Sequence, residues 1–382
     1  MIARLRPLCI AALLLLLTWF AGGQRALGRV DPALAVPLLP LPMLLLAWWQ
    51  RGDPPGLQKR TIIAVLLAIA VGQGTLAAML AGRSGWEQIA LVLAASCVAS
   101  VLFGATLRRR KWGRTLRVLV AAFVVIVWFV AGHALLARLY RAPAPAADAV
   151  VVTMLTGLPL RWAGDDLPEM IAAGAQDDPA LARIEADGPV LLVDSLADHV
   201  PPPGGTLLLA HPRALAPREL VAVDAFVRGG GRAVILADAL SGWPARYPLG
   251  DPRNPPVTSL LTPLLDHWDI TLGAAPVGER AAQAHDVDGR RLRLFSAGRF
   301  EHLPPGCKPF AGARIAHCPI GAGEAWLVGD ADLLFAPLWA PAVPGADHLR
   351  RADTMEWLGA RLRGKGAASA LLHPIWTRSP RP

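Results

Sequence analysis

Residues 62–81 read IIAVLLAIAVGQGTLAAMLA and contain no Asp, Glu, Lys or Arg. A helix of about 20 apolar residues crosses the roughly 30 Å of a bilayer's hydrocarbon core, so this run predicts a transmembrane helix. Similar runs recur through the first 140 residues, none with the polar face that a helix of a soluble protein needs. We therefore expect about five transmembrane helices, near residues 8–22, 33–49, 62–81, 88–107 and 118–138.

Composition supports this assignment, since 54% of the 382 residues are apolar and only 18% are charged, against roughly 45–50% and 25% in globular proteins. The second run contains Pro37, Pro40 and Pro42, which remove backbone donors and are expected to kink or break it. The first run also has the pattern of a cleaved signal peptide, with Arg4 and Arg6 before the apolar stretch.

Basic residues predict the orientation, because loops rich in Lys and Arg stay in the cytoplasm. Loop 51–60 carries three basic residues and loop 108–117 carries six (Arg108, Arg109, Arg110, Lys111, Arg114 and Arg117), whereas loop 82–87 has only Arg83. We expect a multi-pass protein of the cytoplasmic (inner) membrane with its C-terminal domain in the periplasm. The basic loop is interpreted as a topology anchor near anionic lipid, not as a nucleic-acid site, because it has no aromatic platform.

A Pro/Ala linker at 141–148 separates the multispan region, 1–140, from a predicted exported α/β domain at 149–363. Short apolar runs at 149–153, 190–193, 206–210 and 233–237 suit strands buried on both faces of a mainly parallel sheet. A helix at 217–228, stopped by Gly229–Gly231, completes a βαβ unit. The last helix is predicted at 348–363, and the tail, 364–382, is expected to be loosely ordered.

Four cysteines occur. Cys9 and Cys97 lie inside predicted spans and are expected to be inert. Cys307 and Cys318 are close in sequence within the exported part, and in an oxidising compartment they are expected to form a disulfide. A zinc site with His302 and His317 is the alternative, although neither the C-x2-C nor the H-x3-H spacing is present.

Several segments in the second half of the chain resemble one family. They are 156–160 (TGLPL), 207–215 (LLLAHPRAL), 229–232 (GGGR), the strand ending at Asp238, 246–253 (RYPLGDPR), 321–323 (GAG) and 328–334 (VGDADLL). Over roughly residues 149–335 the chain resembles the soluble domain of GldG-like proteins, which are auxiliary components of ABC-type transport and gliding systems. The resemblance implies a flavodoxin-like, class I glutamine amidotransferase-like α/β fold used without known catalysis.

Amidotransferase chemistry needs a Cys at a tight strand-to-helix turn, activated by a His. Here that turn carries His211 and Pro212, and neither exported Cys follows a buried strand into a helix. The family's known subunits have one membrane helix, so the resemblance implies nothing about the multispan region. No nucleotide-binding loop or recognised metal motif occurs, and no cofactor is expected.

The remaining candidates for a ligand site are His211 and the acidic residues Asp194, Asp238, Asp330 and Asp332, each at or after a strand end. Ligands of open α/β sheets bind outside the carboxyl ends of strands, and carboxylates there could hold a divalent cation. The competing interpretation is structural, with each Asp accepting backbone N–H groups at a loop or helix start. His133, inside the last span, has no evident proton-relay partner in the other spans.

The sequence therefore predicts a non-catalytic integral membrane protein, an auxiliary subunit of an ABC-type transport or envelope system with an exported domain that binds a partner or ligand. Its expected partners are the lipid bilayer and separate permease and ATPase subunits, since any energy coupling must come from another protein. The alternative is a membrane-anchored, metal-dependent hydrolase that uses the strand-end carboxylates.

Overall fold

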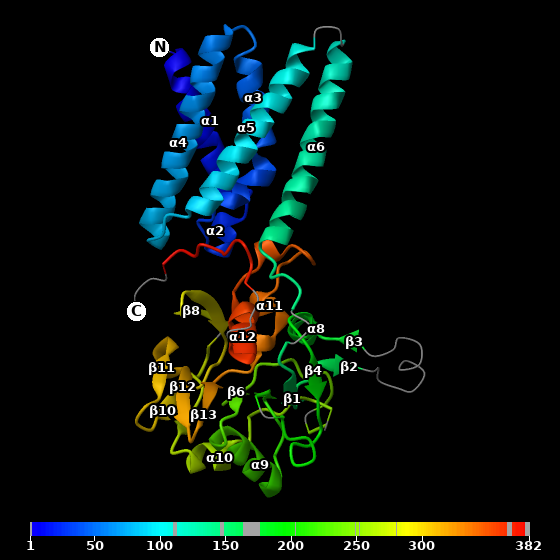
Figure 1. Ribbon diagram of the computed structural model, residues 1–382, viewed down its shortest axis with the longest axis vertical. Helices are drawn as coiled ribbons and strands as arrows, with labels where there is room; N and C mark the ends of the chain where they lie inside the picture. Colours follow the sequence, from blue (N-terminus) through cyan, green and yellow to red (C-terminus); the bar gives the residue numbers. More distant parts are fainter. Residues whose placement is uncertain are drawn as a thin grey trace. The chain divides into compact units, whose positions relative to one another are not determined.

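The structure, a computed structural model, describes residues 2–109, 113–145, 149–162, 176–202, 204–248, 250–251, 253–279, 281–364 and 369–378. The positions outside these ranges include some used above: Arg110, Lys111, Ala146, Ala147, Leu249, Pro252 and the tail residues 365–368 and 379–382. The chain divides into two compact units. A helical unit comprises 1–142, 341–350 and 370–382, and an α/β unit comprises 143–340 and 351–369 (Figure 1).

The helical unit is built from long apolar helices and short connecting ones. Its elements are α1 (Ile2–Phe20), α2 (Gln24–Leu27), η1 (Pro32–Leu38), α3 (Pro40–Trp49), α4 (Pro55–Ala81), α5 (Trp86–Arg108), α6 (Arg114–Leu139) and η4 (Asp347–Leu349). Helices α4 and α5 form a hairpin whose turn uses Gly82 and Gly85, both at positive φ. Within this unit, α1 packs on α4 and α3 packs on α5.

Three helices, α4, α5 and α6, are long and apolar enough to span a membrane, and they indicate membrane association. Helices η1 and α3 pass the same test only as a pair bent by 63°, so a fourth span depends on this broken segment. The apolar part of α1, Leu5–Phe20, is shorter than these three helices. The expected count of about five spans is thus too high for the described residues, but the break at Pro37 and Pro40 is confirmed.

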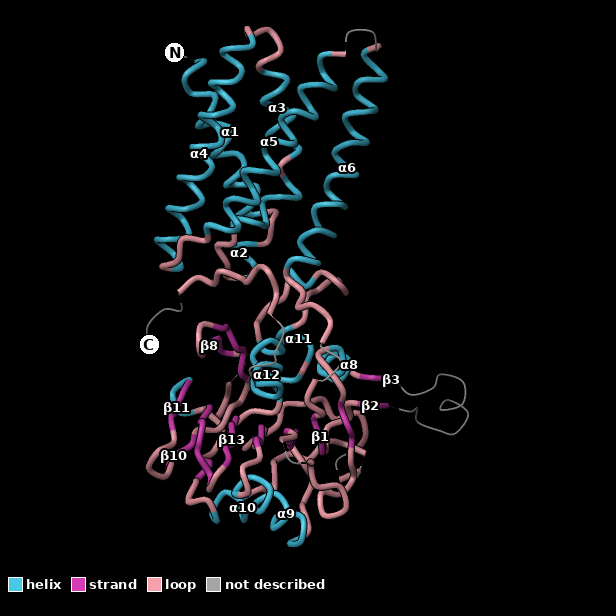
Figure 2. Tube along the Cα trace, in the orientation of Figure 1, coloured by secondary structure: helices cyan, strands magenta, loops and turns pink. Residues whose placement is uncertain are grey.

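The α/β unit centres on a seven-stranded mixed sheet of order β11-β12-β13-β6-β5-β1-β4. Strands β4, β1, β5, β6 and β13 are parallel, and β12 and β11 are antiparallel additions at one edge. The strands are β1 (Val152–Thr156), β4 (Val190–Leu192), β5 (Thr206–Ala210), β6 (Arg232–Leu236), β11 (Lys308–Phe310), β12 (Ile315–Ile320) and β13 (Gly323–Val328). The expectation of a mainly parallel sheet is confirmed, and Figure 2 shows the strands confined to this unit.

Helices cover both faces of the sheet, so every residue of β5 is buried. One core contains residues of α8 (Pro179–Ala186) and α12 (Thr354–Arg363), and the other contains residues of α9 (Pro217–Arg228) and α10 (Thr262–His267). The remaining elements are peripheral: β2 (Arg161–Trp162), β3 (Gln176–Asp177), β7 (Thr271–Leu272), β8 (Gln283–Val287), β9 (Arg290–Leu294), β10 (Phe300–His302), η2 (Ala311–Ala313), η3 (Asp332–Leu334) and α11 (Ala336–Trp339). This layering explains the unalternating apolar strands.

Two boundaries differ from the sequence analysis. The predicted helix at 348–363 begins only at Thr354, because residues 347–349 form η4 within the helical unit. The tail is not loosely ordered where it is described, since Leu372, Ile375 and Trp376 are buried in the helical unit. Segment 341–350, which was predicted to be part of the exported domain, therefore belongs to the helical unit.

Cys307 and Cys318 form a disulfide, as predicted, beside the β11–β12 hairpin. The four side chains of the alternative zinc site are engaged elsewhere. The two sulfurs are bonded to each other, and the two histidines pair with carboxylates. His302 lies 3.2 Å from Asp269, and His317 lies 2.9 Å from Glu324. Cys9 and Cys97 are free and exposed on the surfaces of α1 and α5.

We predict that thiol labelling of the unfolded chain increases by two equivalents after reduction. Double substitution C307S/C318S is expected to lower the free energy of unfolding of the α/β unit by about 2–4 kcal/mol, because the open loop gains conformational entropy in the unfolded state. The control C9S/C97S should leave the labelling difference at two. Equal labelling before and after reduction would contradict the bridge.

Candidate functional site

The carboxyl ends of two neighbouring parallel strands bring three predicted site residues together. Asp238 follows β6, and Asp330 and Asp332 follow β13, its partner in the sheet. One carboxylate oxygen from each residue lies within 4.8 Å of the others, and all three residues are at most 2% exposed. These three carboxylates thus meet at one edge of the sheet. Asp194, after β4, is exposed and is not part of this group.

Backbone donors occupy this carboxylate cluster. Asp238 accepts from Leu240 N and Ala331 N, at 2.9 and 3.0 Å. Asp330 accepts from Phe295 N and Leu333 N, at 2.7 and 3.2 Å. Asp332 accepts from Ser241 Oγ at 3.0 Å and from Gly242 N at 2.5 Å. All six oxygens thus hold loops against the sheet edge, which is the structural role that short acidic side chains commonly have at strand and helix ends.

The cluster's charges interact unfavourably. Burial, and then the nearby Asp332 carboxylate, raise the pKa of Asp238 to about 7. Burial and the two neighbouring carboxylates also hold the pKa of Asp330 well above its usual range, and burial raises the pKa of Asp332. Three buried like charges at this separation repel strongly, so the cluster retains protons at neutral pH.

His211, after β5, lies at the same sheet edge but outside the carboxylate cluster. It is fully buried, at φ 50°, and its Nε2 lies 2.7 Å from the carbonyl oxygen of Pro256. A carbonyl only accepts, so Nε2 carries the proton and Nδ1 is a bare acceptor without a partner in the described part of the chain. Burial lowers the pKa of this ring, which favours a neutral structural histidine.

A small cavity of about 230 Å³ lies next to Asp238. Carboxylate and hydroxyl side chains contribute much of its wall, among them Thr258, Ser259, Thr262, Asp266 and Thr271. Ser259 closes one side by donating from its N and Oγ to the carbonyl oxygen of Asp238, at 2.9 and 3.0 Å. The volume is below the usual range of ligand sites, roughly 300–1,000 Å³, and suits several waters or a small polar molecule.

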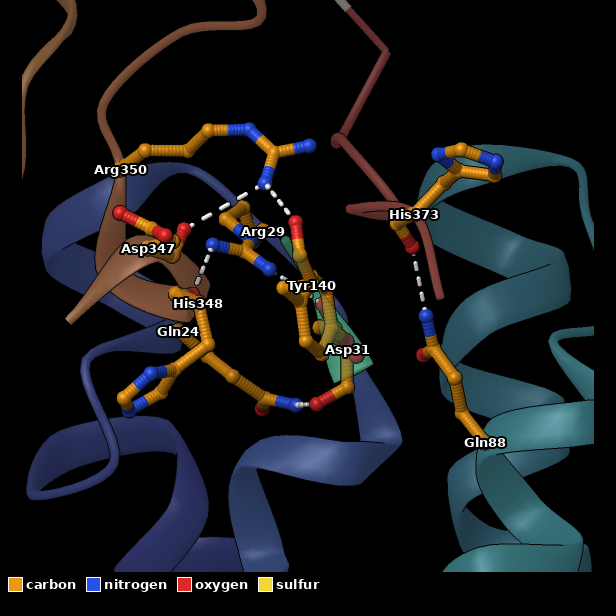
Figure 3. A network of polar contacts seen from close by, with 9 residues as sticks. All are labelled: Gln24, Arg29, Asp31, Gln88, Tyr140, Asp347, His348, Arg350 and His373. Atoms are coloured by element: carbon orange, nitrogen blue, oxygen red, sulfur yellow. Dashed lines mark hydrogen bonds and ion pairs between the residues drawn. The ribbon is translucent and has the colours of Figure 1, made fainter. Parts of the chain in front are cut away.

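The helical unit contains a second buried polar network, drawn in Figure 3, which the sequence analysis did not identify. Arg29 and Asp31 form an ion pair with both side chains completely buried. Tyr140 donates to Asp31 Oδ2 at 2.6 Å, and Arg29 Nη1 donates to the carbonyl oxygen of His348 at 2.6 Å. Gln24 Nε2 adds a bond to the Asp31 carbonyl oxygen at 2.8 Å. These hydrogen bonds satisfy part of the buried pair, whereas Arg29 Nε and Asp31 Oδ1 have no partner among the described residues.

The C-terminal segment completes this network through backbone bonds. Val30 N donates to the Ile375 carbonyl oxygen at 2.8 Å, and Thr377 N donates to that of Gly28 at 3.0 Å. Gln88 Nε2, at the start of α5, donates to the His373 carbonyl oxygen at 2.6 Å (Figure 3). These bonds order the tail. The available signal was weak, because the His348 carbonyl group that Arg29 contacts lies 319 positions away in the sequence.

No known protein family matches the chain, and no curated protein is similar to it. Among solved structures, it is similar to the exo-β-1,4-mannosidase Op5Man5 from Opitutaceae bacterium strain TAV5, at 12% identity and a TM-score of 0.35, over 56% of this chain and 36% of that one. It is also similar to a β-galactosidase from Rahnella sp. R3, at 13% identity and a TM-score of 0.30, over 59% and 34% of the two chains. The chain thus spans about a third of the length of these enzymes, and likeness at this level carries no argument about function.

The carboxylate cluster predicts a pH dependence. The pKa of Asp238 is higher in the folded state than in the unfolded state. The stability that its retained proton contributes to the fold is therefore fully present below about pH 4 and is lost as the pH rises through about 7. Unfolding free energy should therefore fall over this range, by about 1.4 kcal/mol per pH unit for one retained proton. Asp238→Asn, which cannot ionise, should have a slope shallower by about one proton in thermal unfolding between pH 5 and 8. The exposed control Asp266→Asn should keep the parent's slope; a parent without any slope would refute the retained proton.

Proposed function

We propose that this chain is a non-catalytic subunit of the cytoplasmic membrane whose α/β unit lies in the periplasm, where it binds a partner protein or ligand for an ABC-type transport or envelope system. The observation that carries the proposal is the state of the carboxylate cluster. Five of its six oxygens accept from backbone N–H groups and the sixth from the Ser241 hydroxyl group, so these acidic groups hold the sheet edge together.

The cysteines also support a non-catalytic role. The α/β unit has only Cys307 and Cys318, and both are consumed by the disulfide, so no thiol remains for an amidotransferase-type nucleophile. At the turn after β5, where that fold places its nucleophile, His211 and Pro212 stand instead. We assign the parallel strands β4-β1-β5-β6-β13 to a flavodoxin-like arrangement, because their order corresponds to the 2-1-3-4-5 pattern.

Two observations support the proposed compartment. Disulfides persist in oxidising compartments such as the periplasm. Seven described basic residues lie at the ends of α3, α4, α5 and α6 that adjoin loops 51–60 and 108–117, where Arg6 also pairs with Asp53 at 2.5 Å; they are Arg51, Lys59, Arg60, Arg108, Arg109, Arg114 and Arg117. By the charge rule this side is cytoplasmic, and the α/β unit, which follows the opposite end of α6, is on the outer side.

Purification of the tagged full chain from native membranes in mild detergent should co-purify a permease or an ATPase. An unrelated multi-span protein carrying the same tag is the control, and it should not recover these subunits. Repeated recovery of the chain alone, across detergents that keep known transporter complexes intact, would contradict the role as an auxiliary subunit.

A metal-dependent hydrolase is the second candidate, favoured by the gathering of Asp238, Asp330 and Asp332 within 4.8 Å. An ion would share these oxygens with the N–H groups already bonded to them, since each carboxylate oxygen has a second lone pair. If this candidate is correct, titrating the full chain with Mg²⁺, Mn²⁺ or Ca²⁺ should raise its melting temperature, and Asp330→Asn and Asp332→Asn should abolish the rise while Asp266→Asn retains it. We expect no metal-dependent shift in any of the four proteins.

A further inference from the structure

Segment 341–350 is fastened to the helical unit by a pair of histidines. His133 Nδ1, on α6, lies 2.8 Å from His348 Nε2, on η4. The two ring centroids are 5.1 Å apart, and Phe129 packs edge-on against His133. One nitrogen must donate and the other must accept, since two lone pairs or two N–H groups would repel each other at this distance. The contact thus supplies the relay partner that the spans alone did not offer His133.

The surroundings of this histidine pair are mostly cationic or apolar. Arg29 donates to the backbone of His348, and Arg350 donates to the carbonyl oxygens of Tyr140 and Asp347, both at 3.3 Å. The neighbouring carboxylates are already engaged: Asp31 with Arg29 and Tyr140, and Asp347 with Arg141 at 2.5 Å. Leu91 of α5 and Leu372 of the tail belong to the apolar cluster around Leu136 of α6 and Tyr140. The charged or titratable groups at the near ends of α5 and the tail are Glu87, His373 and Arg378, all exposed.

In the closed state the two histidine rings are hydrogen-bonded to each other, and in the open state they are separated and hydrated. The two states differ in how many protons the rings can bind. The closed pair tolerates one extra proton, because one protonated ring can still donate to the neutral ring. A second proton places N–H groups on both facing nitrogens and removes the bond. His348 Nδ1 is also buried without a partner in the described residues, so a proton added there would be an unpaired charged donor.

Electrostatics work in the same direction. Burial first, and then His133 and Arg29, lower the pKa of His348 to about 3. A released, hydrated His348 would titrate near 6.5. Between these values the open state binds more protons than the closed state. The contribution of His348 to the stability of the closed state is therefore fully present above pH 6.5 and decreases as the pH falls.

We propose that the His133–His348 pair is a pH-sensitive latch that holds residues 341–350 on the helical unit and releases them on acidification. Release also withdraws the His348 carbonyl oxygen from Arg29, leaving the buried Arg29–Asp31 pair open to water on that side. The latch would sense the pH outside the cytoplasm if the proposed orientation is correct. Its operation in the purified protein does not depend on that orientation.

Hydrogen exchange of the full chain in detergent tests the latch. Peptides covering 344–352 include the amides of Leu349 and Arg350, which are bonded to the carbonyl oxygens of Ala346 and Asp347. After correction for intrinsic exchange, their opening constant should rise about tenfold between pH 7.5 and pH 5.5, which is the factor for one group of pKa 6.5 that is neutral when closed. The carboxylate cluster is expected to make the α/β unit more stable as the pH falls. Faster exchange in both units at pH 5.5 would therefore indicate a general loss of stability and not release of the latch.

His348→Gln should remove most of this pH dependence, because an amide side chain can bond without titrating in this range. His133→Gln should only reduce it, because burial remains the larger cause of the lowered His348 pKa. The exposed control His199→Gln should retain the tenfold change. An unchanged opening constant in the parent between the two pH values would overturn the proposal, even if a variant failed to fold. So would a tenfold change that persists in both glutamine variants.

Discussion

The buried ion pair between Arg29 and Asp31 is the constraint around which the helical unit is organised. Two charges removed from water need hydrogen bonds in addition to each other, and removing one partner of such a pair typically costs about 3–5 kcal/mol. Here the partners come from distant parts of the chain: Tyr140 at the end of α6 and His348 in the returning segment. The rings of Tyr140 and Trp376 also lie over the Arg29 guanidinium, at 5.5 and 5.3 Å.

In the α/β unit, buried acidic groups are stabilised by backbone N–H groups and by protonation instead of by an arginine. Its sheet edge collects carboxylates whose oxygens accept backbone N–H groups, and burial favours their protonated forms. Such an arrangement ties the loops after β6 and β13 to one point. It also makes the two units respond oppositely to acid, since protons favour the carboxylate edge and weaken the histidine contact of the helical unit.

Features encoded locally were predicted from the sequence. Apolar runs located α4, α5, α6 and the buried strands, the prolines near residue 40 located the break, and the spacing of Cys307 and Cys318 located the disulfide. The carboxylates were found because strand ends meet at one edge of a parallel sheet. Nothing local relates Arg29 to a carbonyl group 319 positions later, and the tail lacks any periodic pattern, so neither the second polar network nor the order of the tail could be derived.

The division of the chain has a practical consequence for anyone who cuts it. The polypeptide passes between the two units after Ala142, Ala340, Arg350 and Ser369, so no single cut separates them. A secreted fragment that starts at the Pro/Ala linker would carry Leu372, Ile375 and Trp376 with their packing partners deleted. Such a fragment would expose these apolar side chains to solvent and is expected to self-associate. Limited proteolysis of the intact protein should instead give fragments that remain associated.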